Sequence, residues 1–554
     1  MGSVDQISDA YVDAYAALDP CAASVLGLTG HDTEITDYGP AGVAARAELD
    51  RRTLAELAGA PAAVGHDRLA ARVLRDHLEA SIALRDAGAT EAELSPFGAI
   101  SEVRRSVELL DRGADTPWET VGARLRAMPA ALAGLRATID EARGAGRVAA
   151  RRQVANSAAQ CDATAAYLDG LRGSYDGPGR DALDRTVAGA CAAFAELAAY
   201  LRTDLAPAAP VRDALGRDRY QLGVRYWLGS RPDLEETYAW GWIELARIGR
   251  EMAAVAGEIA PGESARAVID RLDADPAHTI TGRANFRAWI QELGDRAIAE
   301  LDGVHFDIPE PLRTIECHIA PTNSGGIYTV PPNADFSRPG SVWWTMPTDT
   351  MTTWTVPATM YHEGVPGHHL QQGMTVYNAE TLNRFQRAAT ELGNAGHVEG
   401  WGLYAERLMD ELGYYTEPAH RFGMLALGQR MRAARVILDI GLHLELPIPE
   451  GAGFHDGERW TRELAVEFMR DHLAVADDAF VSFEVDRYLG VPGQALAYKV
   501  GERAWFAVRE EARRRQGASF DLKAFHRAAL DLGPMGLDAF AEEMARRTAT
   551  RPNG

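Results

Sequence analysis

The chain has 554 residues, which is longer than one usual compact domain and predicts either several domains or one large enzyme with lobes around a cleft. Its 46% hydrophobic and 25% charged residues are typical of a globular protein and exclude a fibrous or disordered chain. A formal net charge of -22 would repel phosphate groups, so neither nucleic acid nor an anionic membrane is an expected partner.

The cysteines and the amino terminus bear on the cellular compartment. No CxxC pair occurs, which predicts buried thiols rather than disulfides or a thiolate metal site, at Cys21, Cys161, Cys191 and Cys317. The first residues lack a basic start followed by an apolar run, and no uncharged stretch of 18 residues occurs. These observations predict a cytoplasmic protein.

Most of the first 300 residues have the pattern of amphipathic helices. Leu74, Leu78 and Ile82 recur every four residues, with charged residues between them. The Pro-containing stretch 206–210 is the best candidate for a boundary. We therefore expect an N-terminal helical lobe over 1–210 and a catalytic helical lobe over 211–554, packed into one unit.

The second lobe begins with a predicted long helix over 227–257, with Pro232 near its start. Between 311 and 357, β-branched and aromatic residues alternate with Gly, Pro, Asn and Ser, which predicts a small β region. The expected fold class is therefore mainly α, with a small β-sheet beside the helix that follows it.

That next segment reads ATMYHEGVPGHHLQQG and resembles a zinc-binding motif. In the standard HExxH form, two histidines on one helical face share a zinc ion and the glutamate activates water. In an unbroken helix, His368 would point roughly 120° away from His362, and His369 would lie about 10 Å further along the axis. Neither could then share a metal with His362.

Pro366 and Gly367 supply an interruption. Proline lacks an N–H group and its ring would collide with the carbonyl of His362, while glycine can adopt unusual dihedral angles. We expect a local bulge at this point. A bulge that absorbs two residues makes His368 the second ligand, which is the preferred interpretation, and one that absorbs three makes it His369.

A second helical run, ELGNAGHVEGWGLYAERLMDEL, follows and carries Glu399 and Glu406 on one face. Glu399 is the predicted third ligand, with His397 as a rival. Two histidines and one glutamate leave a position open for water, as a catalytic zinc requires. Glu406 is expected to hydrogen-bond the second nitrogen of a ligating histidine. One zinc ion per chain is the expected cofactor.

At HEGVPGHH and at EGWGLYAE the chain resembles the bacterial family named domain of unknown function 885, over nearly its whole length. That family is similar in outline to helical carboxypeptidases and oligopeptidases, so the resemblance implies a mainly α fold with a deep groove. The patch DRYLGVPGQALAYKVG fits the same resemblance and holds Arg487, Gln494, Tyr498 and Lys499. Tyr498 could donate to a tetrahedral oxyanion, and Arg487 or Lys499 could bind a substrate carboxylate.

The aromatic-rich stretch 322–344 is expected to include an edge strand that a substrate could extend. Tyr328 and Arg338 would line that groove, whereas Trp343 and Trp344 are more typical of core aromatics.

These predictions converge on a zinc-dependent hydrolase of peptide or amide bonds, with His362, His368 and Glu399 as ligands and Glu363 as the general base. The expected partner is a short peptide or small amide, and a homodimer is allowed. Two alternatives remain open: a metal-dependent enzyme of specialised metabolism acting on a non-peptide C–N bond, and a catalytically silent binding protein.

Overall fold

The computed structural model describes residues 3–60, 65–92, 94–110, 116–320, 326–390, 392–473 and 478–548. The chain divides into two compact units, the first formed by 1–223 with 486–492 and the second by 224–485 with 493–554. The boundary lies at 223, whereas the sequence indicated 210. The short internal segment 486–492 returns to the first unit, whereas the C-terminal residues belong to the second.

The first unit is helical in the part that the structure describes. Leu74 and Leu78, which the repeat placed on an apolar face, are fully buried. The helices α6, α7, α8 and α9 pack their apolar faces into one shared core. The helices are α1 (Val4–Leu18), α2 (Pro20–Val25), α3 (Pro40–Gly59), α4 (Gly65–Asp86), α5 (Ala89–Ala92), α6 (Ala99–Glu108), α7 (Trp118–Gly144), α8 (Arg151–Gly170) and α9 (Arg180–Tyr200).

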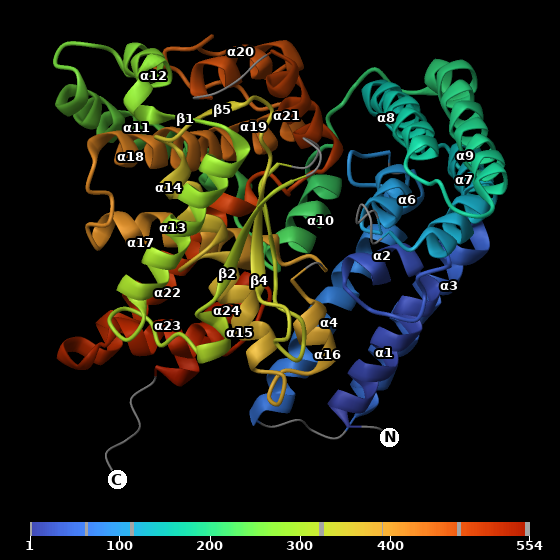
Figure 1. Cartoon of the computed structure of the whole chain (residues 1–554), viewed down its shortest axis with the longest axis horizontal. Helices are drawn as coiled ribbons and strands as arrows, with labels where there is room; N and C mark the ends of the chain where they lie inside the picture. The colour runs from blue at the N-terminus through green and yellow to red at the C-terminus, as the bar shows by residue number, and fades with distance from the viewer. Residues whose placement is uncertain are drawn as a thin grey trace. The chain divides into compact units, whose positions relative to one another are not determined.

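The second unit holds the HEGVPGHH segment. Two helices cross the boundary between the units, namely α10 (Arg217–Leu228) and α21 (Asp478–Gly490). The remaining helices are α11 (Leu234–Ile259), α12 (Ala265–Ala274), α13 (Arg283–Leu301), α14 (Val356–Glu363), α15 (His368–Tyr377), α16 (Arg384–Ala388), α17 (Ala395–Glu411), α18 (Pro418–Gly423), α19 (Met431–Leu444), α20 (Arg462–His472), α22 (Ala497–Gln516), α23 (Leu522–Leu530) and α24 (Leu537–Arg547). A mainly α fold is thus confirmed (Figure 1).

The predicted long helix over 227–257 begins later than expected. It is α11, which starts at Leu234 because the Asp233 side chain caps it by accepting a hydrogen bond from the Glu236 amide. Pro232 therefore lies outside the helix.

The strands lie in the predicted region, with one addition. A three-stranded sheet has the order β2 (Ile315–Ile319), β4 (Gly340–Trp344), β3 (Tyr328–Val330), with β2 and β4 parallel and β3 antiparallel to β4. Figure 1 shows β2 and β4 side by side. A second pair joins β1 (Thr279–Thr281) to β5 (Thr350–Thr352). The small β-sheet is confirmed, and β3 is the expected edge strand next to α15.

Helix α17 is buried on nearly all sides, although it carries several charged residues. Gly400 lies so close to α22 that a Cβ atom there would come within 2.4 Å of the Gly501 backbone. An added methyl group at this position would push the two helices apart. The position of α17 is therefore set by backbone contact with α22.

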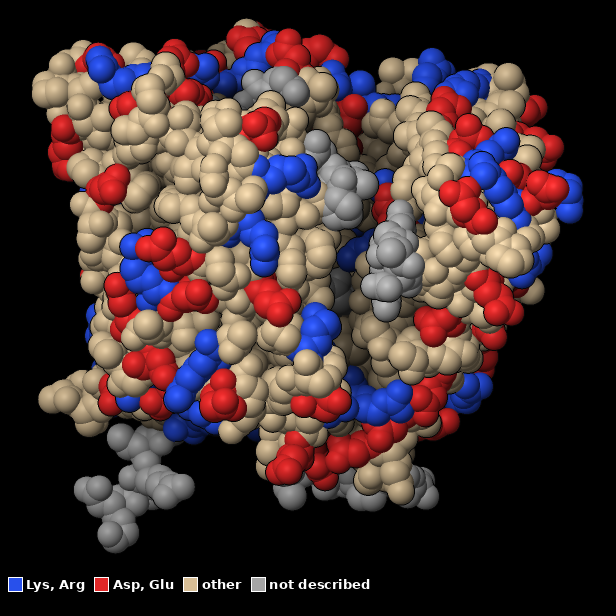
Figure 2. All heavy atoms as spheres, viewed as in Figure 1, with Lys and Arg blue, Asp and Glu red and all other residues tan. Residues whose placement is uncertain are grey.

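The mixed charges on the surface and the unpaired cysteines are what the composition predicts. Figure 2 shows acidic and basic side chains interspersed over the face that it draws. Cys21, Cys161 and Cys317 are buried free thiols and Cys191 is half-buried. Among the described residues, none of the helices combines the length and apolar character that a bilayer span requires.

Candidate metal centre

The chain between the two histidines of the motif leaves the helix altogether. Helix α14 ends at Glu363 and α15 begins at His368, so the expected bulge within one helix is wrong in form. The Val365–Pro366 peptide bond is cis. A Cβ atom on Gly367 would lie 1.8 Å from the His362 carbonyl oxygen, so only glycine fits there. Pro366 and Gly367 thus interrupt the helix as expected, but two separate helices carry the histidines.

This break brings His362 and His368 together with Glu399. One ligand atom from each of the three residues lies within 4.8 Å of the other two. The Glu399 Oε2 atom is 3.2 Å from His362 Nε2 and 3.6 Å from His368 Nε2. A tetrahedral zinc ion with bonds of about 2.0 to 2.1 Å holds neighbouring ligand atoms about 3.4 Å apart. The separations fit a shared metal ion.

The other ring nitrogen of each histidine is already engaged. His362 Nδ1 donates to Glu406 Oε1 at 2.8 Å, and His368 Nδ1 donates to Gln371 Oε1 at 3.3 Å. Both acceptors are oxygens without a proton, which places the hydrogen of each neutral ring on Nδ1. In this neutral form the lone pairs of both Nε2 atoms face Glu399, where a metal ion could bind them; without a metal ion, a protonated ring donates from Nε2 to Glu399 instead. The neutral form is the arrangement of two imidazoles prepared to bind a cation.

The electrostatic environment also favours positive charge. Burial alone would lower the pKa of His362, yet hydrogen bonds with Glu399 and Glu406 raise it to about 10. Burial would raise the pKa of Glu399, but hydrogen bonds from His362 and His368 hold it well below its ordinary value. Buried carboxylates need a compensating cation, which a divalent metal ion would supply.

A glycine on α17, Gly402, leaves space for the His362 imidazole. Glu399, Gly402 and Glu406 follow one another at intervals of three and four residues and share a helical face. A Cβ atom on Gly402 would lie 2.5 Å from His362 Cε1 and 2.7 Å from its Nε2. The His362 ring therefore rests on Gly402, between the two glutamates.

Glu363, the predicted general base, is held from the edge strand. The Thr329 hydroxyl oxygen on β3 lies 2.7 Å from the Glu363 carbonyl oxygen and 2.8 Å from its Oε2. A hydroxyl group has one hydrogen to donate but can also accept one. Thr329 can thus donate to the carbonyl and accept from a protonated carboxyl group, or donate to the ionised carboxylate.

The sequence reasoning did not single out three residues that build this site. Gln371 follows His368 by three residues on α15, a helical spacing that could have indicated it. Trp401 Nε1 donates to the carbonyl oxygens of Pro366 and Gly367, at 2.9 and 3.2 Å, and so holds the break between the helices. Thr329 lies far away in the sequence, and no local signal points to it.

The rival ligands lie elsewhere. His369 Nε2 donates to the Leu312 carbonyl at 3.0 Å, and burial lowers the pKa of this ring to about 4. The His397 ring packs between Trp505 and Phe540, with centroids 5.0 and 4.9 Å away, and burial lowers its pKa to about 3. Of the two candidates, His368 is the one that lies with His362 and Glu399, and its role as a metal ligand stays a prediction.

Lys499 does not face the cluster with a free ammonium group. It is almost fully buried, and it forms ion pairs with Glu244 at 3.0 Å and with Glu502. Its Nζ atom also donates to Gln429 Oε1. Since two carboxylates already neutralise it, a role in binding a substrate carboxylate has no support from this arrangement.

Tyr498 lies among arginines that the sequence reasoning missed. The Arg432 and Arg435 guanidinium carbons are 5.6 and 4.9 Å from the centre of its ring. Burial and the nearby Arg435 lower the pKa of Arg432, whereas Glu406, Tyr498 and Glu399 oppose this. Arg432 therefore lies close enough to Glu399 and Glu406 for their charges to act on it, while its Nη1 atom donates to the Leu427 carbonyl at 2.7 Å.

The remaining residues of the same sequence patch are buried. Gln494 lies just before α22. Arg487 belongs to the first unit, where its guanidinium carbon is 5.0 Å from the centre of the Tyr488 ring. Its proposed contact with substrate stays a prediction.

The edge strand presents one exposed aromatic side chain. Tyr328 is 40% exposed and stacks on Trp343, with ring centroids 6.3 Å apart. Trp344 is buried in the core, as expected, whereas Trp343 is half-buried. Arg338 donates to the carbonyls of Pro331 and Pro339 and so supports its own loop. Substrate binding along β3 stays a prediction.

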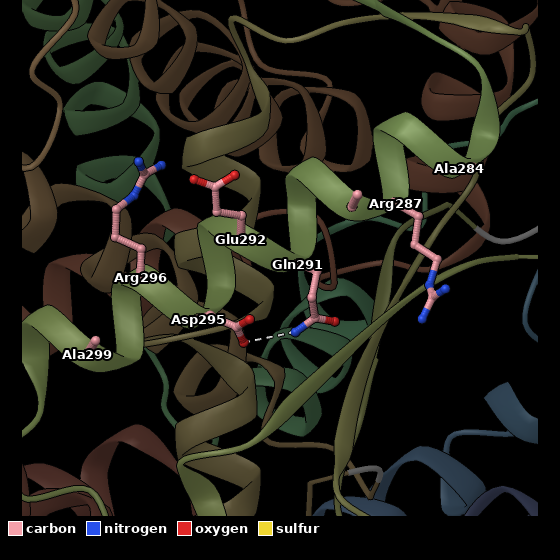
Figure 3. Close-up of a pocket in the computed structure, with 8 residues that line it drawn as sticks. Ala284, Arg287, Gln291, Glu292, Asp295, Arg296 and Ala299 are labelled. Atoms are coloured by element: carbon pink, nitrogen blue, oxygen red, sulfur yellow. Dashed lines mark hydrogen bonds between the residues drawn. The ribbon is translucent and has the colours of Figure 1, made fainter.

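Two surface concavities lie in the second unit, and neither is lined by a residue of the metal cluster. One has a volume of about 660 Å³ and lies along α13. Figure 3 shows its lining, where the Gln291 amide donates to Asp295 between Arg287 and Arg296. The other, of about 340 Å³, is lined by residues such as Glu244, Arg407 and Glu502. The deep groove implied by the family resemblance therefore stays a prediction.

Comparisons with known proteins agree on the fold. A candidate lipoprotein from Colwellia psychrerythraea has a similar structure, with 20% identity and a TM-score of 0.81, over 99% of this chain and 100% of that one. A candidate lipoprotein of unknown function from Shewanella oneidensis has 19% identity and a TM-score of 0.73, over 98% and 100%. No curated protein matches the chain. The family model described as bacterial protein of unknown function (DUF885) matches residues 20–544, and the chain therefore belongs to the DUF885 family.

Proposed function

We propose that the chain is a metal-dependent hydrolase of peptide or amide bonds, with zinc held by His362, His368 and Glu399. The observation that supports this most is the convergence of two Nε2 atoms on one Glu399 oxygen, at 3.2 and 3.6 Å. Zinc fits the donor set, because it favours two imidazoles and a carboxylate and then retains an open position. When bound, zinc would polarise a carbonyl group and lower the pKa of water.

The protein's own groups would handle the proton. Glu363 would take a proton from the attacking water and deliver it to the departing amine, so that the C–N bond breaks and a carboxylic acid and an amine form. The Thr329 hydroxyl would hold the carboxyl group in both protonation states, since it can donate or accept. Glu406 and Gln371 would keep the two imidazoles in their orientation.

The cation suited to a substrate carboxylate is Arg432 rather than Lys499. Lys499 is neutralised by Glu244 and Glu502, whereas the Arg432 guanidinium lies over the Tyr498 ring and has no carboxylate in ion-pair contact among the described residues. A guanidinium group can bind a carboxylate through two hydrogen bonds. Tyr498, beside it, would donate to the oxyanion that forms during attack. These roles favour substrates with a free carboxylate.

The test is hydrolysis of a mixed pool of dipeptides and tripeptides, with products identified by mass spectrometry. We expect cleavage that a chelator abolishes and that one equivalent of zinc restores. The control is the His362→Ala variant, which should fold but should neither bind zinc at this cluster nor cleave. Zinc at this cluster without cleavage of any peptide or amide would contradict the proposal and leave the binding protein or the non-peptide C–N enzyme.

The cellular location needs a separate test. A cytoplasmic protein is the prediction from the sequence, whereas two proteins of similar structure are described as candidate lipoproteins. Fractionation of cells that express the native gene, followed by detection of the chain in each fraction, separates the two. Recovery with the membrane fraction would contradict the cytoplasmic prediction.

A further inference from the structure

A second cluster of metal-binding side chains lies in the second unit, apart from the residues described above. It consists of His278, Glu417 and His420, and one ligand atom of each lies within 4.8 Å of the other two. His278 ends the short 3-10 helix η5 (Pro276–His278), and the other two residues open α18. The proposed hydrolytic mechanism uses none of them.

The backbone around these side chains is fixed. The Thr353 amide donates to the His278 carbonyl at 2.8 Å, and the His420 amide donates to the Glu417 carbonyl at 3.0 Å. The His420 Nε2 and Glu417 Oε2 atoms are 3.8 Å apart, and the two imidazole centroids are 6.4 Å apart at 75°. Donor atoms from two segments distant in the sequence therefore meet at one point.

The chemistry of the set suits a transition metal. Two imidazoles and one carboxylate bind Zn²⁺, Co²⁺, Ni²⁺ or Cu²⁺ in preference to Mg²⁺ or Ca²⁺, which select oxygen ligands. Among the described residues, none forms a hydrogen bond with either imidazole ring, so the nitrogens remain available for a ligand.

Two features weaken this cluster relative to the first. The Glu417 side chain is 59% exposed, so water competes for it. Arg296 also acts on His420, because its charge contributes to the lowered pKa of that ring. A nearby cation opposes the binding of another, so we expect lower affinity here than at the buried cluster.

We propose that His278, Glu417 and His420 form a second, weaker transition-metal site that cross-links η5 to α18. Both segments adjoin the helix that carries His362. The chain continues from η5 into β1, which pairs with β5, and β5 precedes α14. Helix α18 packs directly against α14. A metal ion bound here would therefore stabilise the segments next to α14, the helix that carries His362. It would not contact the substrate.

The experiment uses the full-length His362→Ala/His368→Ala double variant, which removes the first cluster. Equilibrium dialysis of the double variant against Zn²⁺ should give one bound zinc ion per chain. A triple variant that also carries His420→Ala should bind none. Zinc should raise the melting temperature of the double variant but not of this triple variant. The outcome is independent of catalysis, so it separates failure of this site from failure of the proposed hydrolase.

A matched control is available in the first unit. His31 and Glu34 form a histidine–glutamate pair three residues apart, as do Glu417 and His420, but in the part of the chain that the structure describes no third ligand joins them. His31→Ala in the double variant should therefore leave the bound equivalent unchanged, and Glu417→Gln should weaken binding at least tenfold. The proposal is overturned by a double variant that binds no zinc, by retention of zinc after His420→Ala, or by equal loss after His31→Ala, which would mean an adventitious ion only.

Discussion

The Thr329 hydroxyl oxygen lies between the two oxygens of Glu363 that it can reach, 2.7 Å from the carbonyl and 2.8 Å from the carboxylate. The residue therefore links the edge strand β3 to the last residue of α14. If Glu363 moves a proton, Thr329 is the group that keeps its carboxyl in place while the charge changes.

Substitution of Glu363 by Gln should leave the metal cluster intact, because Glu363 is not one of the three converging residues. Loss of a general base typically lowers turnover by roughly 10² to 10⁴. We expect normal zinc content and melting temperature with this loss of turnover, measured on whichever peptide the wild-type protein cleaves. Wild-type turnover in this variant would refute the assigned role.

The Thr329→Val variant removes the hydroxyl and preserves the shape of the side chain. Because a hydrogen bond to a charged group contributes about 1.5 kcal/mol or more, kcat should fall about tenfold with KM little changed. Thr329→Ser should restore kcat, and a variant in which only stability changes would indicate a structural role alone.

Gly402→Ala tests the contact between α17 and the imidazole. Its Cβ atom would lie 2.5 Å from His362 Cε1, so the ring must move and the zinc content should fall at least tenfold. Gly249→Ala is the control, because it lies within α11 and a Cβ atom there meets nothing within 4 Å. That control should retain zinc and gain about 0.5 to 1 kcal/mol of stability. Equal zinc content in both variants would argue against the geometry.

Arg432→Gln should act on binding rather than on chemistry. For a substrate with a free carboxyl terminus, KM should rise by about tenfold, which corresponds to one lost charged hydrogen bond. For the same peptide with an amidated terminus, KM should not change. An equal effect on both substrates would show that Arg432 does not contact the substrate carboxylate.

The buried His526 predicts a loss of stability in acid. It accepts a hydrogen bond from the Tyr404 hydroxyl at 2.8 Å, and burial, with a contribution from Arg509, lowers its pKa to about 3. The unfolded chain binds a proton here below about pH 6.5, whereas the folded chain does not. The free energy of unfolding should therefore fall as the pH drops from 6.5 toward 3, by at most about 1.4 kcal/mol per unit.

His526→Gln keeps an acceptor for Tyr404 but cannot take up the proton. Denaturant unfolding at pH 7, 6, 5 and 4 should therefore show a shallower pH dependence in this variant than in the wild type. Replacement of the exposed His66 by Gln serves as the control and should leave the slope as it is. A parallel decline in all three proteins would contradict the prediction.

Much of the fold could be predicted because it depends on local patterns. The repeat of Leu74 and Leu78 indicated a buried helical face, and the alternation after 311 indicated strands. The spacing argument at Pro366 correctly required a break that brings His362 and His368 together. Its exact form could not be predicted, because ending one helix and starting another depends on contacts such as the Trp401 hydrogen bonds to the linker.

Contacts between distant segments account for the rest. The pairing of Thr329 with Glu363 depends on how β3 is placed against α14, which no periodicity encodes. The isolated Lys499 suggested a substrate-binding cation, but Glu244, more than two hundred residues earlier, neutralises it. In the sequence, Lys499 and Arg432 are both simply positive charges. Only the three-dimensional structure shows that Lys499 is paired with a carboxylate and that Arg432 lies over Tyr498.

The glycine at the crossing of α17 and α22 limits how this protein can change. A longer side chain at Gly400 would separate the two helices, and an inserted residue between Glu399 and Glu406 would rotate one carboxylate about 100° away from the other. Evolution or engineering can therefore alter the ends of α17 and its loops, but the eight residues from Glu399 to Glu406 must keep both their number and their glycines for the cluster to assemble.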